Sequence, residues 1–177
     1  MSRLQKNESA VSPVIGVMLM IVVTIIIAAV VAAFSGGLSS DQKKTPNAVF
    51  VVAGVSTSGN GTVTFQQTGG DELALNEIII QLQYNGQAIT LSNADKMRGH
   101  SDLNYLTEVG GSSDGYITAS DRFILTADTN SNSQFSYRPD GAAAAFTLPY
   151  NAHISYMILD KTSGKAIQNG EFVLRNS

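Results

Sequence analysis

Few of the residues that commonly perform chemistry in proteins stand here at spacings that would let them act. The chain has 177 residues, two histidines (His100 and His153) and no cysteine. Neither histidine has a second metal ligand or a Ser–Asp partner at a characteristic local spacing. No phosphate-binding glycine loop, nucleophile elbow or HExxH motif occurs in the chain. The sequence therefore predicts a protein that is not an enzyme, needs no cofactor and has no metal site.

One stretch has the opening spacing of a calcium loop. Asp128, Asn130 and Asn132 place oxygen-bearing side chains at alternate positions. The glycine and the distant acid of an EF-hand are absent, and such residues are also common in solvated loops. We therefore assign no metal here, and calcium binding near Asp128 stays an open alternative.

Two further features concern the protein surface. Asn60-Gly61-Thr62 is an N-glycosylation acceptor on a predicted exposed turn. Four tyrosines lie in or beside predicted loops, where they are candidates either for adhesive surface contacts or for packing under the loops. They are Tyr105, Tyr116, Tyr137 and Tyr150.

The element that must position everything else is an apolar run near the N-terminus. No charged residue occurs between Glu8 and Asp41, and Thr24 is the one polar side chain from Val14 to Phe34. As a helix this run spans roughly 30 Å, the thickness of the bilayer's hydrocarbon layer. Its apolar residues cover every face, so it does not suit the core of a globular domain. Pro13 fits the first helical turn.

The totals limit the possible functions. A net charge of −3 with 14% charged residues gives no electrostatic support for nucleic-acid binding. The absence of cysteine removes disulfides and thiol chemistry. Arg3 and Lys6 in the leader favour a cytoplasmic N-terminus and an exported remainder. Small residues at 32–36 also fit a signal-peptidase site, so conventional cleavage after the run is an alternative.

The remainder of the chain has the pattern of an all-β domain. Residues 36–47 contain two glycines and end near Pro46, which indicates a flexible linker. From Ala48 the apolar residues alternate, and Asn85-Gly86 is a strong hairpin signal. Two more hairpins are expected at Ser58–Gly61 and Lys161–Gly164. The predicted strands are Ala48–Val55, Thr62–Gln67, Glu77–Tyr84, Gln87–Leu91, Tyr116–Ala119, Asp121–Ala127, Ala144–Leu148, His153–Asp160 and Lys165–Leu174.

The fold class expected is α+β, with a long N-terminal hydrophobic helix followed by an antiparallel sandwich or barrel. The predicted parts are a leader (1–9), a helix (10–35), a linker (36–47) and an extracellular β-domain (48–177). Two polar, glycine-containing stretches, His100–Gly115 and Asp128–Pro139, are expected to be surface loops.

The stretch ESAVSPVIGVMLMIVVTIIIAAVVAAF resembles the N-terminus of archaeal type IV pilins, and its SPVIGV part is closer to adhesion pilins than to archaellins. The resemblance continues in VTFQQTGGDEL, where Gln67 stands at a position that often carries His, and in the closing ISYMILDKTSGKAI. It implies cleavage by a prepilin peptidase between Ser9 and Ala10, to within one residue. Bacterial pilins carry a glutamate at the fifth mature position, which is Val14 here.

The resemblance also implies partners and a location. After cleavage the helix can leave lipid only if other apolar helices surround it, as in a filament core of identical subunits. Small residues would let neighbouring helices approach closely; with Pro13 they form the predicted packing set of Gly16, Ala28, Ala29, Ala32 and Ala33. An assembly ATPase and a membrane platform are implied as partners. The precursor would lie in the cytoplasmic membrane and the filament at the archaeal cell surface, serving adhesion.

The alternative function is a binding module: an uncleaved, single-pass membrane protein with an extracellular β-domain.

Overall fold

The computed structural model describes residues 11–37, 44–98, 100–111, 114–131 and 134–175. The predicted leader, the predicted scissile bond and residues 38–43 of the predicted linker lie outside these ranges. The chain divides into two compact units, residues 1–42 and 43–177.

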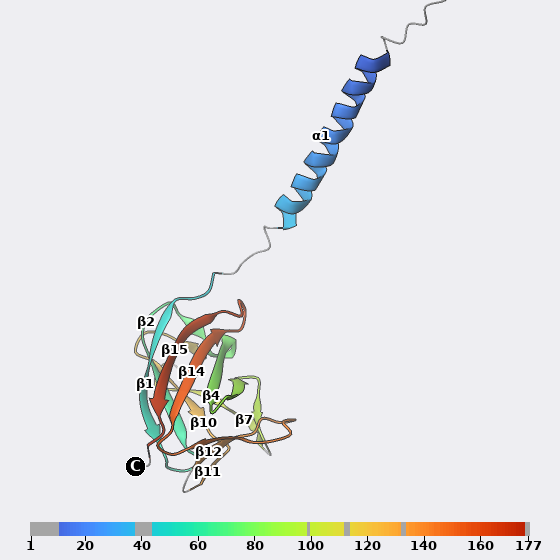
Figure 1. The fold of residues 1–177 in the computed structure, drawn as a ribbon. Coiled ribbons are helices and arrows are strands. Elements are labelled where there is room, and N and C mark those ends of the chain that lie inside the picture. The colour runs from blue at the N-terminus through green and yellow to red at the C-terminus, as the bar shows by residue number, and fades with distance from the viewer. Residues whose placement is uncertain (1–10, 38–43, 99, 112–113, 132–133, 176–177) are drawn as a thin grey trace, which may run out of the picture. The chain divides into compact units, whose positions relative to one another are not determined.

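The first unit contains one helix, α1 (Val11–Gly37), with Pro13 in its first turn (Figure 1). Every side chain described in it, from Pro13 to Ser35, is exposed. The hydroxyl of Thr24 donates to the carbonyl oxygen of Ile21 at 2.8 Å, so the one polar side chain of the run is bonded within the helix. Residues Pro13–Ser35 are long and apolar enough to cross a membrane.

The second unit is built on two four-stranded antiparallel sheets (Figure 1). The first has the order β1 (Ala48–Ser56), β2 (Thr62–Gly70), β10 (Arg122–Thr126), β8 (Leu106–Val109). The second has the order β15 (Ala166–Val173), β14 (His153–Asp160), β4 (Ile78–Tyr84), β5 (Gln87–Ser92). The expected α+β fold class, a helix followed by an antiparallel β-domain, is confirmed.

Short elements extend this framework. They are β3 (Leu73–Ala74) with β9 (Tyr116–Ile117), β6 (Lys96–Met97) with β7 (His100–Asn104), the three-stranded sheet of β11 (Thr129–Ser131), β12 (Gln134–Tyr137) and β13 (Phe146–Pro149), and the 3₁₀ turn η1 (Leu75–Glu77).

The two large sheets share one hydrophobic core. Alternation on β14 turns Ile154, Tyr156 and Ile158 inward. Phe65 of β2 meets Tyr156 edge-on at 5.2 Å between ring centroids, which joins the two sheets. Phe65 also stacks on Phe123 of β10 at 5.2 Å. Because the chain has no cysteine, this packing and the hydrogen-bonded ladders hold the domain together.

The predicted hairpins are confirmed. Asn85 and Gly86 both have positive φ, 48° and 75°, as a type I′ turn between β4 and β5 requires. The turn at Ser58–Gly61 joins β1 to β2, and the turn at Lys161–Gly164 joins β14 to β15.

The prediction of two surface loops is wrong, because both stretches contain strands and buried core residues. The stretch His100–Gly115 contains β7 and β8, and Asp128–Pro139 contains β11 and β12. Tyr105, Leu106, Phe135 and Tyr137 from these stretches are at most 1% exposed. Each of these four strands is three to five residues long, too short for alternation to stand out among polar neighbours.

Candidate functional site

The first candidate feature is the apolar surface of α1, whose described side chains are all exposed. Four of the predicted packing residues form two neighbouring rows on the helix surface. Ala28 and Ala32 form one row and Ala29 and Ala33 the other, with the two members of each row about one turn apart. Gly16 lies about 120° around the axis from Ala28 at 3.6 residues per turn, and no atom lies within 4 Å of a Cβ built on it. The helix therefore presents small residues on more than one side, which suits close approach by more than one neighbouring helix.

The start of the β-domain is held by a reciprocal pair of hydrogen bonds. The Asp71 backbone N–H donates to the Asn47 carbonyl oxygen at 2.8 Å, and the Asn47 N–H donates to the Asp71 carboxylate at 2.9 Å. Gly70, with φ of +106°, lies so close that a Cβ would stand 2.2 Å from the Asn47 oxygen. The glycine and aspartate of the TGGD stretch thus fix the residue that precedes β1.

Two further contacts reinforce this point of the domain. Gln67 is fully buried, and its side-chain N–H donates to the Asp71 carbonyl oxygen at 2.8 Å. Thr45 donates to the hydroxyl of Ser163 at 3.2 Å, in the turn between β14 and β15. In the sequence, TGGD stands out only as part of the resemblance to archaeal pilins. In the structure it holds Asn47 in place at the start of β1.

The side chain of Gln168 connects the two large sheets where β1 lies beside β15, a junction called the seam below. The amide of Gln168 accepts from the Phe50 N–H at 2.6 Å and donates to the Phe50 carbonyl oxygen at 2.5 Å. It therefore satisfies the backbone of the edge strand β1 as a neighbouring strand would. No local pattern predicted this pair, because its members are 118 residues apart.

The two described candidate calcium residues, Asp128 and Asn130, already hydrogen-bond to groups of the protein itself, and one carboxylate oxygen of Asp128, Oδ1, is buried without a partner among the described residues. The Asp128 carboxylate accepts from the Tyr105 hydroxyl at 2.7 Å and from the Arg138 backbone N–H. Asn130 donates to the Thr57 carbonyl oxygen and accepts from the Tyr150 hydroxyl. Asn132 lies outside the described residues. Among the described residues there is no group of three or more His, Cys, Asp and Glu that could hold a metal.

The four candidate tyrosines divide between packing and exposure. Tyr105 and Tyr137 are completely buried. Burial raises the pKa of both, and the Asp128 carboxylate raises the pKa of each further. Tyr150 is half-buried and Tyr116 is 48% exposed. Packing under neighbouring segments is thus the role of the first two.

The remaining predicted site residues lie apart from these contacts. Asn60 is exposed in the turn between β1 and β2. His153 is exposed at the start of β14, and His100 is in β7.

Comparison with known proteins gives the following matches. Residues 9–50 match the family model described as archaeal type IV pilin, N-terminal. No curated protein sequence matches the chain. Among solved structures, the chain is similar to the archaellum periplasmic stator protein FlaG from Sulfolobus acidocaldarius, with 10% identity and a TM-score of 0.40. The similarity covers 71% of this chain and 99% of that one, and it is too distant to assign a function.

The matched segment includes the apolar helix whose described side chains are all exposed. The N-terminal part of the chain, residues 9–50, is therefore similar to the N-terminal segment of archaeal type IV pilins, which are structural subunits rather than enzymes.

Proposed function

We propose that the chain is a prepilin, cleaved between Ser9 and Ala10 by a prepilin peptidase and polymerised through α1 into a surface filament. The observation that carries this proposal is a helix of 27 residues, apolar on every side, within a segment that matches the pilin family from residue 9. In water such a surface is unstable; lipid or a bundle of like helices removes it from solvent. The filament core takes the place of lipid after cleavage.

In this proposal the precursor is anchored in the cytoplasmic membrane and the filament is displayed on the archaeal cell surface for adhesion. An assembly ATPase and a polytopic membrane platform drive the transfer. Asn60 is the proposed site of N-glycosylation, since it is exposed in a turn at the edge of the β-domain.

The N-terminus of the protein sheared from its host's cells tests the proposal. Intact mass and peptide sequencing should show a chain that begins at Ala10 in a filamentous fraction. Ser9→Leu places a bulky side chain at the scissile bond and should leave the leader attached, with the chain retained in membranes. Ser2→Leu is the matched control in the same leader and should be processed normally. A wild-type chain that keeps Met1 or Ser2 and is extracted only by detergent would identify an uncleaved membrane anchor instead.

Helix packing is tested separately from cleavage. Ala28→Leu combined with Ala32→Leu adds bulk along one row of α1 and should abolish filaments while cleavage and membrane insertion persist. Val30→Leu is the control, because Val30 lies about 180° around the helix from that row at 100° per residue. Equal filament yields, measured by electron microscopy and by the amount of sheared protein, would show that this row does not pack.

A further inference from the structure

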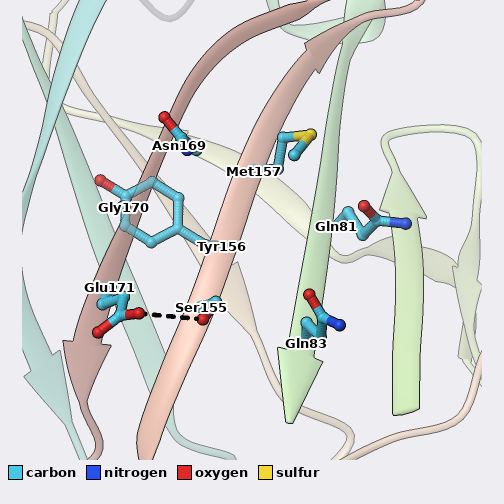
Figure 2. A pocket seen from close by; sticks show the side chains of 8 residues that line it. All are labelled: Gln81, Gln83, Ser155, Tyr156, Met157, Asn169, Gly170 and Glu171. Atoms are coloured by element: carbon cyan, nitrogen blue, oxygen red, sulfur yellow. Dashed lines mark hydrogen bonds between the residues drawn. The ribbon is translucent and has the colours of Figure 1, made fainter. Parts of the chain in front are cut away.

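The outer face of the second large sheet carries a shallow pocket of about 210 Å³ that lies over β15, β14 and β4 (Figure 2). Its rim consists of side chains on the solvent side of these strands: Gln81, Gln83, Ser155, Met157, Asn169 and Glu171. Tyr156 and Gly170 complete the lining. The pocket lies entirely within the β-domain, away from the contacts at Asn47 and Asp71.

Strand register arranges these side chains in two rows. Gln83, Ser155 and Glu171 are directly opposite one another across β4, β14 and β15. Gln81, Met157 and Asn169 form the next row on the same face. Neighbours in a row are on strands about 4.8 Å apart, and the rows are separated by two residues, or about 6.8 Å. Polar groups therefore lie on both strands beside Met157 and in the next row of the same face.

Behind the pocket, a glycine leaves room for a core side chain. A Cβ on Gly170 would lie 2.7 Å from the Tyr156 hydroxyl and 2.8 Å from the ring. The Tyr156 ring lies against β15 at Gly170 (Figure 2), on the core side of the sheet, where it meets Phe65 and Phe172. Because this ring is held in the core, it supports β14 and β15 from the face opposite the pocket, so the strands that carry the rim are fixed before any ligand arrives, which lowers the ordering cost of binding.

The rim is rich in unused hydrogen-bonding groups. Three primary amides, on Gln81, Gln83 and Asn169, each carry two N–H donors and an acceptor oxygen. Within the ranges that the structure describes, none of these amides is hydrogen-bonded to the rest of the chain. Ser155 donates to the Glu171 carboxylate at 3.4 Å, a weak bond that leaves the carboxylate able to accept more. Such groups can donate to and accept from one ligand.

Charge narrows the class of ligand. Glu171 is the one charged residue in the lining, and no Lys, Arg or His contributes. Phosphate, sulfate and carboxylate ligands would meet a negative charge with no compensating cation. The lining also lacks the exposed aromatic and Arg anchors that dominate protein–protein contacts. A neutral ligand with several hydroxyl groups and an apolar C–H face is the best chemical match, with the C–H face against Met157.

We propose that this pocket binds a neutral saccharide, one ring at a time. Its volume is below the range of about 300–1,000 Å³ for drug-sized ligands, which suits a single pyranose. Amides and the carboxylate bind the hydroxyls, and Met157 contacts the ring. The inference deepens the proposed adhesive function by naming the ligand class, and it rests on that function for its biological setting.

The test uses the full chain in detergent micelles, so it does not depend on cleavage or on filament formation. The probes are methyl glycosides of glucose, mannose, galactose and N-acetylglucosamine, observed by saturation-transfer NMR and titrated for affinity. At least one should bind. Asn169→Leu combined with Gln83→Leu should weaken that binding by roughly tenfold or more, since two hydrogen-bonding groups are lost. Gln87→Leu, at an exposed amide of β5 outside the pocket, should leave the affinity unchanged.

Glu171→Gln separates a neutral from a cationic ligand. The affinity of this variant for the saccharide should fall by less than about tenfold, because the new amide still bonds to hydroxyls. A lysine-rich peptide should not bind the wild type. The proposal is overturned if no neutral glycoside binds the folded chain, if the double variant binds as well as wild type, or if only charged probes bind. An uncleaved N-terminus with intact saccharide binding would refute the filament and leave this site standing.

Discussion

Replacement of Gly70 by alanine tests the view that the TGGD stretch locks the start of the β-domain. Gly70 has φ of +106°, a conformation that L side chains rarely adopt. The added Cβ would lie 2.2 Å from the Asn47 oxygen and 2.6 Å from the Ala48 Cα. Both are backbone atoms, so the clash cannot be relieved by rotating a side chain.

The expected cost follows from these two effects. A strained backbone position costs about 1–3 kcal/mol, and loss of the two hydrogen bonds between Asn47 and Asp71 costs about 0.5–1.5 kcal/mol each. The free energy of unfolding should therefore fall by about 2–6 kcal/mol. For a domain of this size, that lowers the melting temperature by roughly 10 °C or more.

Thermal unfolding of the full chain in detergent, followed by circular dichroism of the β-signal, measures the effect. Gly69→Ala is the matched control, because Gly69 is the preceding residue, its φ is not in the left-handed region, and its Cβ would meet no atom within 4 Å. It should change the free energy of unfolding by less than about 1 kcal/mol. Equal losses in the two variants, or no loss in Gly70→Ala, would refute the proposed lock.

Two further predictions concern buried polar groups. Gln168→Leu should lower the free energy of unfolding by about 2–4 kcal/mol, because it leaves the N–H and carbonyl of Phe50 without their partner; a denaturant midpoint equal to that of wild type would contradict this. Tyr105→Phe should destabilise by about 1–2 kcal/mol through loss of the bond to Asp128, whereas Tyr137→Phe should be neutral or stabilising, since its buried hydroxyl has no partner among the described residues. Burial raises the pKa of both tyrosines above the ordinary 10.0, so their contribution to stability is complete below pH 10 and is lost as the pH rises further. Denaturation measured from pH 8 to 12 should show this alkaline loss, and Tyr137→Phe should reduce it.

The regular parts of the fold could be predicted because their signals are local. The alternation on β14 gave its bounds, and the Asn85-Gly86 pair gave a hairpin whose positive φ values the structure contains. The apolar helix followed from composition alone. Strands β8 and β12 were missed because four residues each give little alternation, and they are stabilised by pairing with β10 and β13 rather than by their own sequence.

The contacts that hold the candidate site together could not be predicted for a related reason. Asn47 and Asp71 are 24 residues apart, and Phe50 and Gln168 are 118 apart. No periodicity connects residues at such separations, so only the folded chain brings them together. The pocket that we propose binds a saccharide is of the same kind, because it needs β4 beside the β14–β15 hairpin, and β4 is distant from that hairpin in the sequence.

The seam at Gln168 determines how a tethered β-domain would carry force. In the proposed filament, a subunit would be pulled at Asn47, at the start of β1, while a ligand bound in the proposed pocket would pull on β15. These two strands run in the same direction (Figure 1), so tension between the two points loads their seam in shear rather than peeling it open. The paired bonds between Gln168 and Phe50 would then share the load with the aromatic core. The mechanical strength of attachment would therefore depend on one glutamine that touches neither the filament core nor the ligand.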